Sequence, residues 1–408
     1  MAQKPVPKSE LQKAVDMVAM YGTVREASKR LNIPDTTLKN RLLRAGEAGI
    51  KASEGIEDLT NPFHLRRQIA RLQDEVKKAE QEKLTHTIIK SKIIGLANQV
   101  SDMEPPPWVI GPMKDTHSPG VPTVFLSDLH WEETVSPNQV NGVNKYNMDI
   151  ANARLERLAE RTIRLCGIIS PKFDYPGIVV ALGGDCINGN LVEEMTATNQ
   201  CNSMPAVLDL FGALCRFIKT LLDRFGAVFV PCVSGNHSRI TRKVWHADRH
   251  ATSLDWLLYM FLAKHFESDK RVTFLIPEST EALYRIYTHR FLLTHGDSFK
   301  SGDSMIGPLG PVARGSLKKA SRNTQIGMEF DTMIVGHFHT EHFSRRIIMN
   351  GSLVGYNAYA FNNNFLFEPP AQQLWITNER YGLTFRFPVQ VDEQPPVGKS
   401  RQWVSVSR

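Results

Sequence analysis

The chain has 408 residues, of which 42% are hydrophobic and 22% are charged. This ordinary globular composition excludes a disordered or fibrous protein, and the length allows about two to three domains. The 49 Lys and Arg residues exceed the 42 Asp and Glu residues, and the formal net charge of +7 mildly favours polyanionic partners. The five cysteines form no CxxC pair, and neither a secretory signal nor a membrane-spanning run is visible. We therefore expect a protein with no membrane partner, located in the cytoplasm of a bacterial host cell or in an equivalent reducing compartment.

Residues 8–51 predict a small all-α module. A run of apolar residues at helical spacing ends at Gly22, and Thr23 with Glu26 matches a capping box. Asp35 or Thr36 is expected to cap a third helix, which is basic. Two short helices joined by a tight turn indicate a helix-turn-helix, and docking of another protein on this bundle stays open as an alternative to DNA binding. The candidate DNA-binding residues are Thr37, Lys39, Asn40, Arg41 and Arg44.

Residues 63–100 predict one long helix. Its apolar seam covers about two heptads, which is fewer than a coiled coil usually needs. A homodimer through this helix and packing of the helix on the next domain are therefore both open. Residues 101–120 are rich in proline and predict a linker, and residues 392–408 predict a flexible tail.

Residues 121–391 predict an α/β domain, because short β-branched runs alternate with helical segments. The expected helices include residues 152–169 and 203–225, and the segments after Arg345 are expected to form antiparallel strands. Residues 299–323 combine glycine and proline with basic residues and predict a loop, either solvated or a lid over a phosphodiester. Five apolar runs predict strands, namely TVFL, GIVVAL, AVFVPCV, RFLLTH and TMIVG.

Polar residues follow each of these five runs. The motifs in chain order are DLH from Asp128, GGD ending at Asp185, GNH from Gly235, HGD from His295 and GHFH from Gly336. In open α/β sheets ligands bind at the carboxyl ends of strands, so one site would collect carboxylates, an amide and imidazoles. Clustered carboxylates repel one another unless a cation lies between them. Mixed nitrogen and oxygen ligands suit Mn, Fe or Zn better than Ca or Mg, and two such ions could clamp a phosphoryl group and generate hydroxide for in-line attack.

This ordered set of motifs resembles the calcineurin-like metallophosphoesterase family, which includes the SbcD-type DNA nucleases, and the segment NGSLVGYNAYAF is similar to phage or prophage members. The resemblance implies a β-sandwich flanked by helices that holds two divalent metal ions, with Mn expected first and Fe, Zn, Ni or Mg as alternatives. By the same resemblance, one ion is bound by Asp128, His130, Asp185 and His339. The other is bound by Asp185, Asn236, His295 and His337.

The resemblance also assigns His237 as the general acid or as an electrostatic stabiliser of the transition state. Many relatives read GNHD or GNHE, whereas this chain reads GNHSR, so Ser238 does not supply the acidic partner of His237. Arg239 could bind a phosphate instead. Arg314, within the predicted basic loop, is a second candidate for phosphate binding.

Taken with the N-terminal module, the motifs predict a dimetal-dependent phosphodiesterase that acts on DNA as a nuclease. One alternative keeps the chemistry and changes the substrate to a phosphomonoester, a nucleotide or a phosphoprotein. Another alternative is a DNA-binding regulator whose metal domain is vestigial.

Overall fold

The computed structural model describes residues 6–52, 106–111, 118–299 and 307–393. The chain divides into two compact units, Met1–Thr87 and Ile88–Arg408. The long helix predicted for residues 63–100, and with it the predicted dimer, lies outside the described residues.

In the first unit, the described residues 6–52 form a bundle of three helices. Its core contains Ala14, Ala27 and Leu38, one from each helix and all fully buried. The α2–α3 connection is short, so the local pattern of two helices and a tight turn is present, while DNA binding by it stays a prediction. The helices are α1 (Lys8–Tyr21), α2 (Val24–Leu31) and α3 (Asp35–Glu47).

The sequence predicted three helix ends, and two of them agree with the structure. Gly22 ends α1 in the left-handed conformation, with φ 72°, and the Thr23 side chain accepts a hydrogen bond from the backbone N–H of Glu26. The predicted cap of α3 was wrong. Pro34 occupies that position, and Asp35 already belongs to the helix, where its carboxylate accepts a hydrogen bond from Ser28. That carboxylate is therefore used to join α2 to α3.

The second unit contains two β-sheets. One has six strands in the order β11-β10-β1-β2-β3-β4, and the other has five in the order β5-β6-β7-β9-β8. Neighbouring strands from β1 to β4 are parallel, and so are β6 with β7 and β7 with β9. The strands are β1 (Val121–Leu126), β2 (Ile178–Leu182), β3 (Val228–Pro231), β4 (Val272–Leu275), β5 (Glu281–Ile286), β6 (His289–Thr294), β7 (Thr332–Val335), β8 (His342–Phe343), β9 (Ile347–Met349), β10 (Ala371–Asn378) and β11 (Gly382–Gln390).

The apolar strands are buried on both faces. In β1, Val124 and Leu126 point to one core, and Phe125 points to the other, as the period of two in a strand requires. The core between the sheets joins Phe125 of the first sheet to Tyr284 and Phe291 of the second. The two sheets therefore form a sandwich, as the fold prediction expected.

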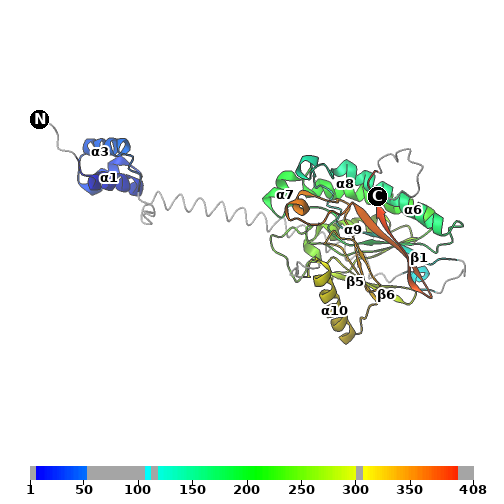
Figure 1. Ribbon diagram of the computed structural model, residues 1–408. Coiled ribbons are helices and arrows are strands. Elements are labelled where there is room, and N and C mark those ends of the chain that lie inside the picture. The colour runs from blue at the N-terminus through cyan, green and yellow to red at the C-terminus, as the bar shows by residue number, and fades with distance from the viewer. Residues whose placement is uncertain (1–5, 53–105, 112–117, 300–306, 394–408) are drawn as a thin grey trace, which may run out of the picture. The chain divides into compact units, whose positions relative to one another are not determined.

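Helices cover the outer faces of the sandwich (Figure 1). α6 (Met148–Ile169), α8 (Ser203–Phe225) and α9 (Leu254–His265) pack on the six-stranded sheet, and α10 (Leu309–Gln325) packs on the other sheet through Val312. Among the helices that the structure describes, none combines the length and the apolarity needed to cross a membrane. The shorter helices are α5 (Pro107–Ile110), α7 (Glu193–Thr198), α11 (Ala358–Asn362), η1 (Pro137–Gln139) and η2 (His250–Thr252).

Three parts of this unit differ from the sequence-based expectation. The loop expected over residues 299–323 is largely helix α10, because Pro311 lies in the first turn, where a missing N–H costs nothing, and Gly315 packs closely on Phe299. β9 runs parallel to β7, since the β8–β9 hairpin returns the chain in the direction of β7. Within the expected linker, α5 buries Val109 in the core between the sheets.

Asp392, the first residue of the predicted tail, contacts helix α6. The carboxylate of Asp392 lies 2.6 Å from the buried guanidinium of Arg154, so the chain is held to α6 at this point. Arg154 also donates hydrogen bonds to the carbonyls of Leu353 and Val354. One buried arginine thus connects α6, the segment after β9 and the end of β11.

Candidate metal centre

The five predicted motifs lie together, although their strands belong to two different sheets. β1, β2 and β3 belong to the six-stranded sheet, and β6 and β7 belong to the other. The backbone N–H of His337 lies 3.0 Å from both carboxylate oxygens of Asp128, and Nδ1 of His295 lies 2.8 Å from the carbonyl oxygen of Gly183. These bonds join the strand ends of one sheet to those of the other.

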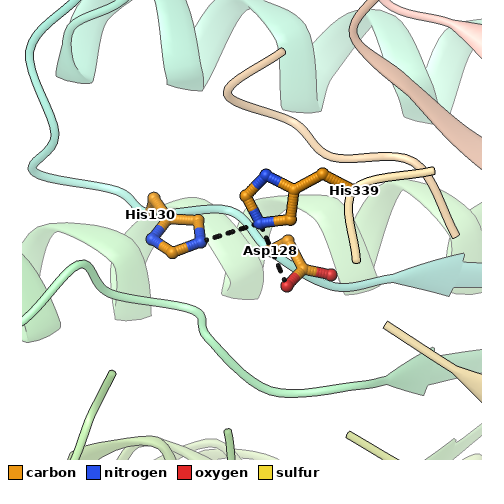
Figure 2. Close-up of side chains that lie close together, drawn as sticks. All are labelled: Asp128, His130 and His339. Carbon is orange, nitrogen blue, oxygen red and sulfur yellow. Dashed lines mark hydrogen bonds and ion pairs between the residues drawn. The ribbon is translucent and has the colours of Figure 1, made fainter. Parts of the chain in front are cut away.

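Asp128, His130 and His339 form the first of two His/Asp groups (Figure 2), with one ligand atom from each residue within 4.8 Å of the others. Nε2 of His130 lies 3.2 Å from Nε2 of His339, which lies 3.4 Å from Oδ1 of Asp128. Asp128 and His130 follow β1, whereas His339 follows β7. Ligand atoms from residues that follow strands of both sheets thus lie close together.

Asp185, His295 and His337 form the second group, with the same spacing limit of 4.8 Å. Nε2 of His295 lies 3.0 Å from Oδ2 of Asp185 and 3.1 Å from Oδ1 of Asn236. The amide oxygen of Asn236 is therefore within reach of the same site. Six of the seven residues predicted as metal ligands make up these two neighbouring groups, and the seventh, Asn236, lies beside the second group.

The electrostatics of both groups suit a metal. Burial by itself would raise the pKa of Asp185, but the nearby His295 and His237 lower it well below its usual value. Burial together with the neighbouring imidazoles His237 and His339 lowers the pKa of His130 to about 3, and burial with His295 lowers that of His337 to about 4. Ionised carboxylates and neutral imidazoles are the forms that bind metal ions.

Two histidines are exceptions within these groups. Burial acts to lower the pKa of His339, but the adjacent carboxylate of Asp128 raises it above its usual value. The other exception is His295. Burial acts to lower its pKa, but the adjacent carboxylate of Asp185 raises it to about 10. The buried negative charge of Asp185 thus favours a proton on His295. A divalent ion would replace that proton, so the donor set fits the group that the motifs predict.

The backbone of the site is strained. Left-handed φ angles occur at Asp128 (55°), His130 (45°), Asp185 (51°), His337 (69°) and His339 (51°). Residues with a Cβ rarely adopt this conformation, and each instance costs about 1–3 kcal/mol unless its surroundings enforce it. Such strain gathered on the same residues that carry the ligand atoms indicates a functional site.

Two positions in the motifs require glycine, because a carboxylate side chain lies directly against the backbone there. A Cβ at Gly235 would lie 2.0 Å from Oδ1 of Asp185, and a Cβ at Gly336 would lie 2.7 Å from Oδ2 of Asp128. Any side chain at these positions would push a carboxylate out of place.

His237 is oriented by a backbone carbonyl. Its Nδ1 lies 3.0 Å from the carbonyl oxygen of Asn188, and its ring centroid is 4.7 Å from that of His130. Ser238 instead pairs with Ser253 at 2.9 Å, so the orienting partner of His237 lies elsewhere, as the sequence implied. The Asn188 side chain also lies 3.0 Å from Nδ1 of His130, so one residue positions both imidazoles.

Asp255 on α9 is a positioning residue that the motif search missed. Its fully buried carboxylate accepts hydrogen bonds from the backbone N–H groups of Asp185 (3.0 Å), Cys186 (3.2 Å) and Gly235 (2.9 Å). Burial, with the charge of Asp185, raises the pKa of Asp255 to about 6. A single acid inside the apolar run LDWLLYMFLA was the available signal, because a buried carboxylate needs partners.

An ion pair between Arg249 and Asp297 also connects the ligand loops. Nη1 of Arg249 lies 2.9 Å from Asp297, and Nη2 donates to the carbonyl oxygen of Gly235 at 3.1 Å. Glu132 also holds a loop of the site, because its carboxylate accepts hydrogen bonds from the backbone N–H groups of Asn188 and Gly189, both at 2.9 Å. Nothing in the sequence near Arg249 indicated this contact.

The remaining candidates stay predictions. The Arg239 guanidinium donates to the carbonyls of Asn236 and Thr241, so it braces its own loop. Arg314 lies on the exposed side of α10. On α3, Arg41 forms an ion pair of 2.6 Å with Glu10. The other candidates on this helix divide by burial: Lys39 and Asn40 are exposed, and Thr37 and Arg44 are half-buried.

The fold and the site together define an α/β protein with two adjacent candidate His/Asp metal sites. No protein-family model matches the chain, and no curated protein matches its sequence. Among solved structures, a single mutant of Vps29 from Entamoeba histolytica is 13% identical, with a TM-score of 0.27, and the match covers 65% of this chain and 98% of that one.

Two further structures resemble the chain at a similar level. Vps29 from Cryptosporidium parvum is 10% identical with a TM-score of 0.24, and the match covers 66% of this chain and 98% of that one. The sulfate thiohydrolase SoxB from Thermus thermophilus is 10% identical with a TM-score of 0.29, and the match covers 69% of this chain and 59% of that one.

Proposed function

We propose that this protein is a dimetal-dependent phosphoesterase that hydrolyses phosphodiester bonds in DNA. The observation that carries the proposal is the pair of adjacent His/Asp groups, on residues whose backbone is held in the left-handed region. The ordered strand-end motifs, which resemble those of calcineurin-like metallophosphoesterases, support the same chemistry.

In this proposal the two groups hold one cation each. Asp128, His130 and His339 would hold the first, His295, His337 and Asn236 would hold the second, and Asp185 would serve both. When bound, a pair of divalent ions polarises the phosphoryl group and lowers the pKa of water. The mixed nitrogen and oxygen donors favour Mn, with Fe, Zn, Ni or Mg as alternatives.

His237 is the proposed general acid. The carbonyl oxygen of Asn188 can only accept a hydrogen bond, so Nδ1 of His237 carries a hydrogen. This leaves Nε2 as the nitrogen that holds or releases the second proton. In the imidazolium form, Nε2 would donate that proton to the leaving oxygen of the phosphodiester.

DNA is the proposed substrate because of two features of the chain. The formal net charge is +7, and the N-terminal bundle exposes Lys39 and Asn40 on α3. Basic and amide side chains on one helix suit contacts with phosphates and base edges.

Metal analysis combined with a substrate panel tests this function. With Mn²⁺, the purified protein should cleave DNA and a small aryl phosphodiester faster than an aryl phosphomonoester. Asp185→Asn should abolish turnover and lower the bound metal. His237→Ala should retain the metal and lose about 10²–10⁴-fold in turnover, as expected for loss of a general acid.

Asp269→Asn is the matched control, because Asp269 is paired with Arg271 ahead of β4, away from the carboxyl ends of the strands. Faster cleavage of the phosphomonoester would show that the protein is a phosphatase and not a phosphodiesterase. Cleavage of the small diester without cleavage of DNA would refute the DNA assignment alone. Selective DNA binding with no metal and no turnover would favour a regulator.

A further inference from the structure

Residues 356–367, here called the aromatic segment, expose a cluster of rings. Tyr359 is 68% exposed, Phe365 54% and Phe367 55%, and Leu366 between them is 86% exposed. Soluble proteins rarely leave several large apolar side chains exposed side by side without a binding role. The segment follows β9 and includes helix α11 (Ala358–Asn362).

The rings are held in place by contacts within the segment. Tyr356 is the central support, because its ring centroid lies 5.4 Å from that of Phe367 and its hydroxyl donates to the carbonyl oxygen of Phe365 at 2.9 Å. The exposed rings of Tyr359 and Phe365 lie 5.8 Å apart, nearly perpendicular at 81°. Because the rings are already ordered, binding of a partner would cost little conformational entropy.

The aromatic segment begins beside the metal centre. The backbone N–H of Leu353, three residues before it, donates to the carbonyl oxygen of Asp128 at 3.1 Å. The Asn357 side chain donates to Glu133 at 2.8 Å, and another oxygen of Glu133 lies 3.9 Å from Nδ1 of His130. Asn357 also caps α11, so the same residue connects the helix to the surroundings of the ligands.

The chemistry of the segment points to nucleobases. Residues 356–367 contain five aromatic residues and four asparagines, and no charged residue that would repel a phosphate backbone. Aromatic faces stack on unpaired bases, and amide groups can bond to base edges. Bases within a duplex are already stacked and would not be available to these rings.

We propose that the aromatic segment stacks unpaired bases next to the scissile phosphate, so that single-stranded DNA is the preferred substrate. The inference rests on the proposed function, because the bound strand must pass over the metal centre. Tyr359 and Phe365, as the exposed ring pair, are the proposed specificity-determining residues.

Steady-state kinetics on two strands of equal length, one with bases and one abasic, test the proposal. Tyr359→Ala and Phe365→Ala should each raise KM for the base-bearing strand about tenfold, with kcat retained, because stacking acts on binding. KM for the abasic strand and for methyl aryl phosphodiester should not change. Phe365→Tyr, which keeps a ring, should behave as the wild type.

Tyr381→Ala is the matched control. Tyr381 is 65% exposed, but it lies in the β10–β11 turn, beside the start of β1 and so at the opposite end of the strands. An equal KM change for both strands, or no change for either, would overturn the proposal. So would a shift from dimer to monomer in sedimentation velocity with an unaltered KM, which would make the rings an interface between copies of the chain.

Binding of a strand that contains 2-aminopurine separates this inference from the proposed function. Stacking quenches the fluorescence of that base without any need for hydrolysis. Quenching by the wild type that Tyr359→Ala and Phe365→Ala abolish would support the stacking surface, even if no phosphodiester is cleaved. Hydrolysis of both strands without any quenching would uphold the phosphodiesterase and refute the stacking surface.

Discussion

At the scale of single residues, the site depends on carboxylates that do not touch the metal positions themselves. Asp255 receives three backbone N–H groups from the loops that carry Asp185 and Asn236. Glu132 receives two more from the loop that carries Asn188. These bonds fix backbone conformations that Asp185 would not adopt on its own, as its φ of 51° indicates.

Asp255→Asn should weaken metal binding while preserving the fold. An amide nitrogen in place of one carboxylate oxygen would face a backbone donor, which costs about 1–3 kcal/mol for the group left unpaired. Loss of such a supporting bond typically lowers metal affinity about 10–100-fold. Calorimetric titration with Mn²⁺ measures the affinity, and urea unfolding measures the stability. Unchanged affinity in a destabilised variant would show that Asp255 supports the fold alone.

At the scale of elements, α10 shows how an unfavourable local sequence can still form a helix. Glycine and proline within residues 309–325 argue against it, but burial of Val312 and the close packing of Gly315 on Phe299 fix it against the second sheet. Glu281 at the start of β5 adds an ion pair with Lys319 and Arg322 from this helix. Tertiary contacts thus outweigh helix propensity here.

Glu281→Gln should destabilise the protein by about 1 kcal/mol at neutral pH, a modest value because one partner, Arg322, is half exposed. Burial would raise the pKa of Glu281, but Lys319 and Arg322 lower it below 4.5. A lowered pKa in the folded state contributes stability above pH 4.5, and this contribution disappears as the pH falls through the folded value.

Thermal unfolding of the wild type and of Glu281→Gln between pH 4 and pH 8 measures this difference. It should be constant above about pH 6 and shrink toward pH 4. Glu329→Gln is the control, since Glu329 pairs with Arg290 at the surface. A difference that stays the same at pH 4 would contradict the ion-pair explanation.

At the scale of the whole second unit, the candidate metal centre joins the two sheets. Each His/Asp group takes residues from both: Asp128 and Asp185 follow strands of the six-stranded sheet, and His295, His337 and His339 follow strands of the other. Bound cations would therefore act as cross-links between the sheets at this end of the sandwich.

Removal of metal should lower the melting temperature. A ligand at 100 times its Kd stabilises the folded state by about 2.7 kcal/mol, which corresponds to about 5 °C or more for a domain of this size. Differential scanning calorimetry with EDTA, then with added Mn²⁺, measures the shift and its reversal. His295→Ala should lose the response, and His246→Ala, an exposed histidine, should keep it. If neither EDTA nor Mn²⁺ changes the melting temperature of the wild type, the result would argue against a metal centre.

The sequence by itself determined the local features of this protein. Short apolar runs predicted β1, β2, β3, β6 and β7, because strands buried on both faces need continuous apolar residues. The polar motifs after those strands contain the six residues of the two His/Asp groups and Asn236 beside them, since glycine and clustered carboxylates and imidazoles are recognisable within a few residues. The strands β4 and β5 were not predicted, because polar residues interrupt both and leave no continuous apolar run.

Only the tertiary structure decided how these pieces are arranged and supported. The division of the strands between two sheets and the parallel course of β9 depend on pairing between distant segments, which no local pattern encodes. The same holds for the partners of the site. Asp255 holds the Asp185 loop, and the Asn188 carbonyl orients His237, through contacts between residues far apart in the chain. A hydrogen bond of this kind depends on where two groups meet in space, and packing of the whole domain sets that position.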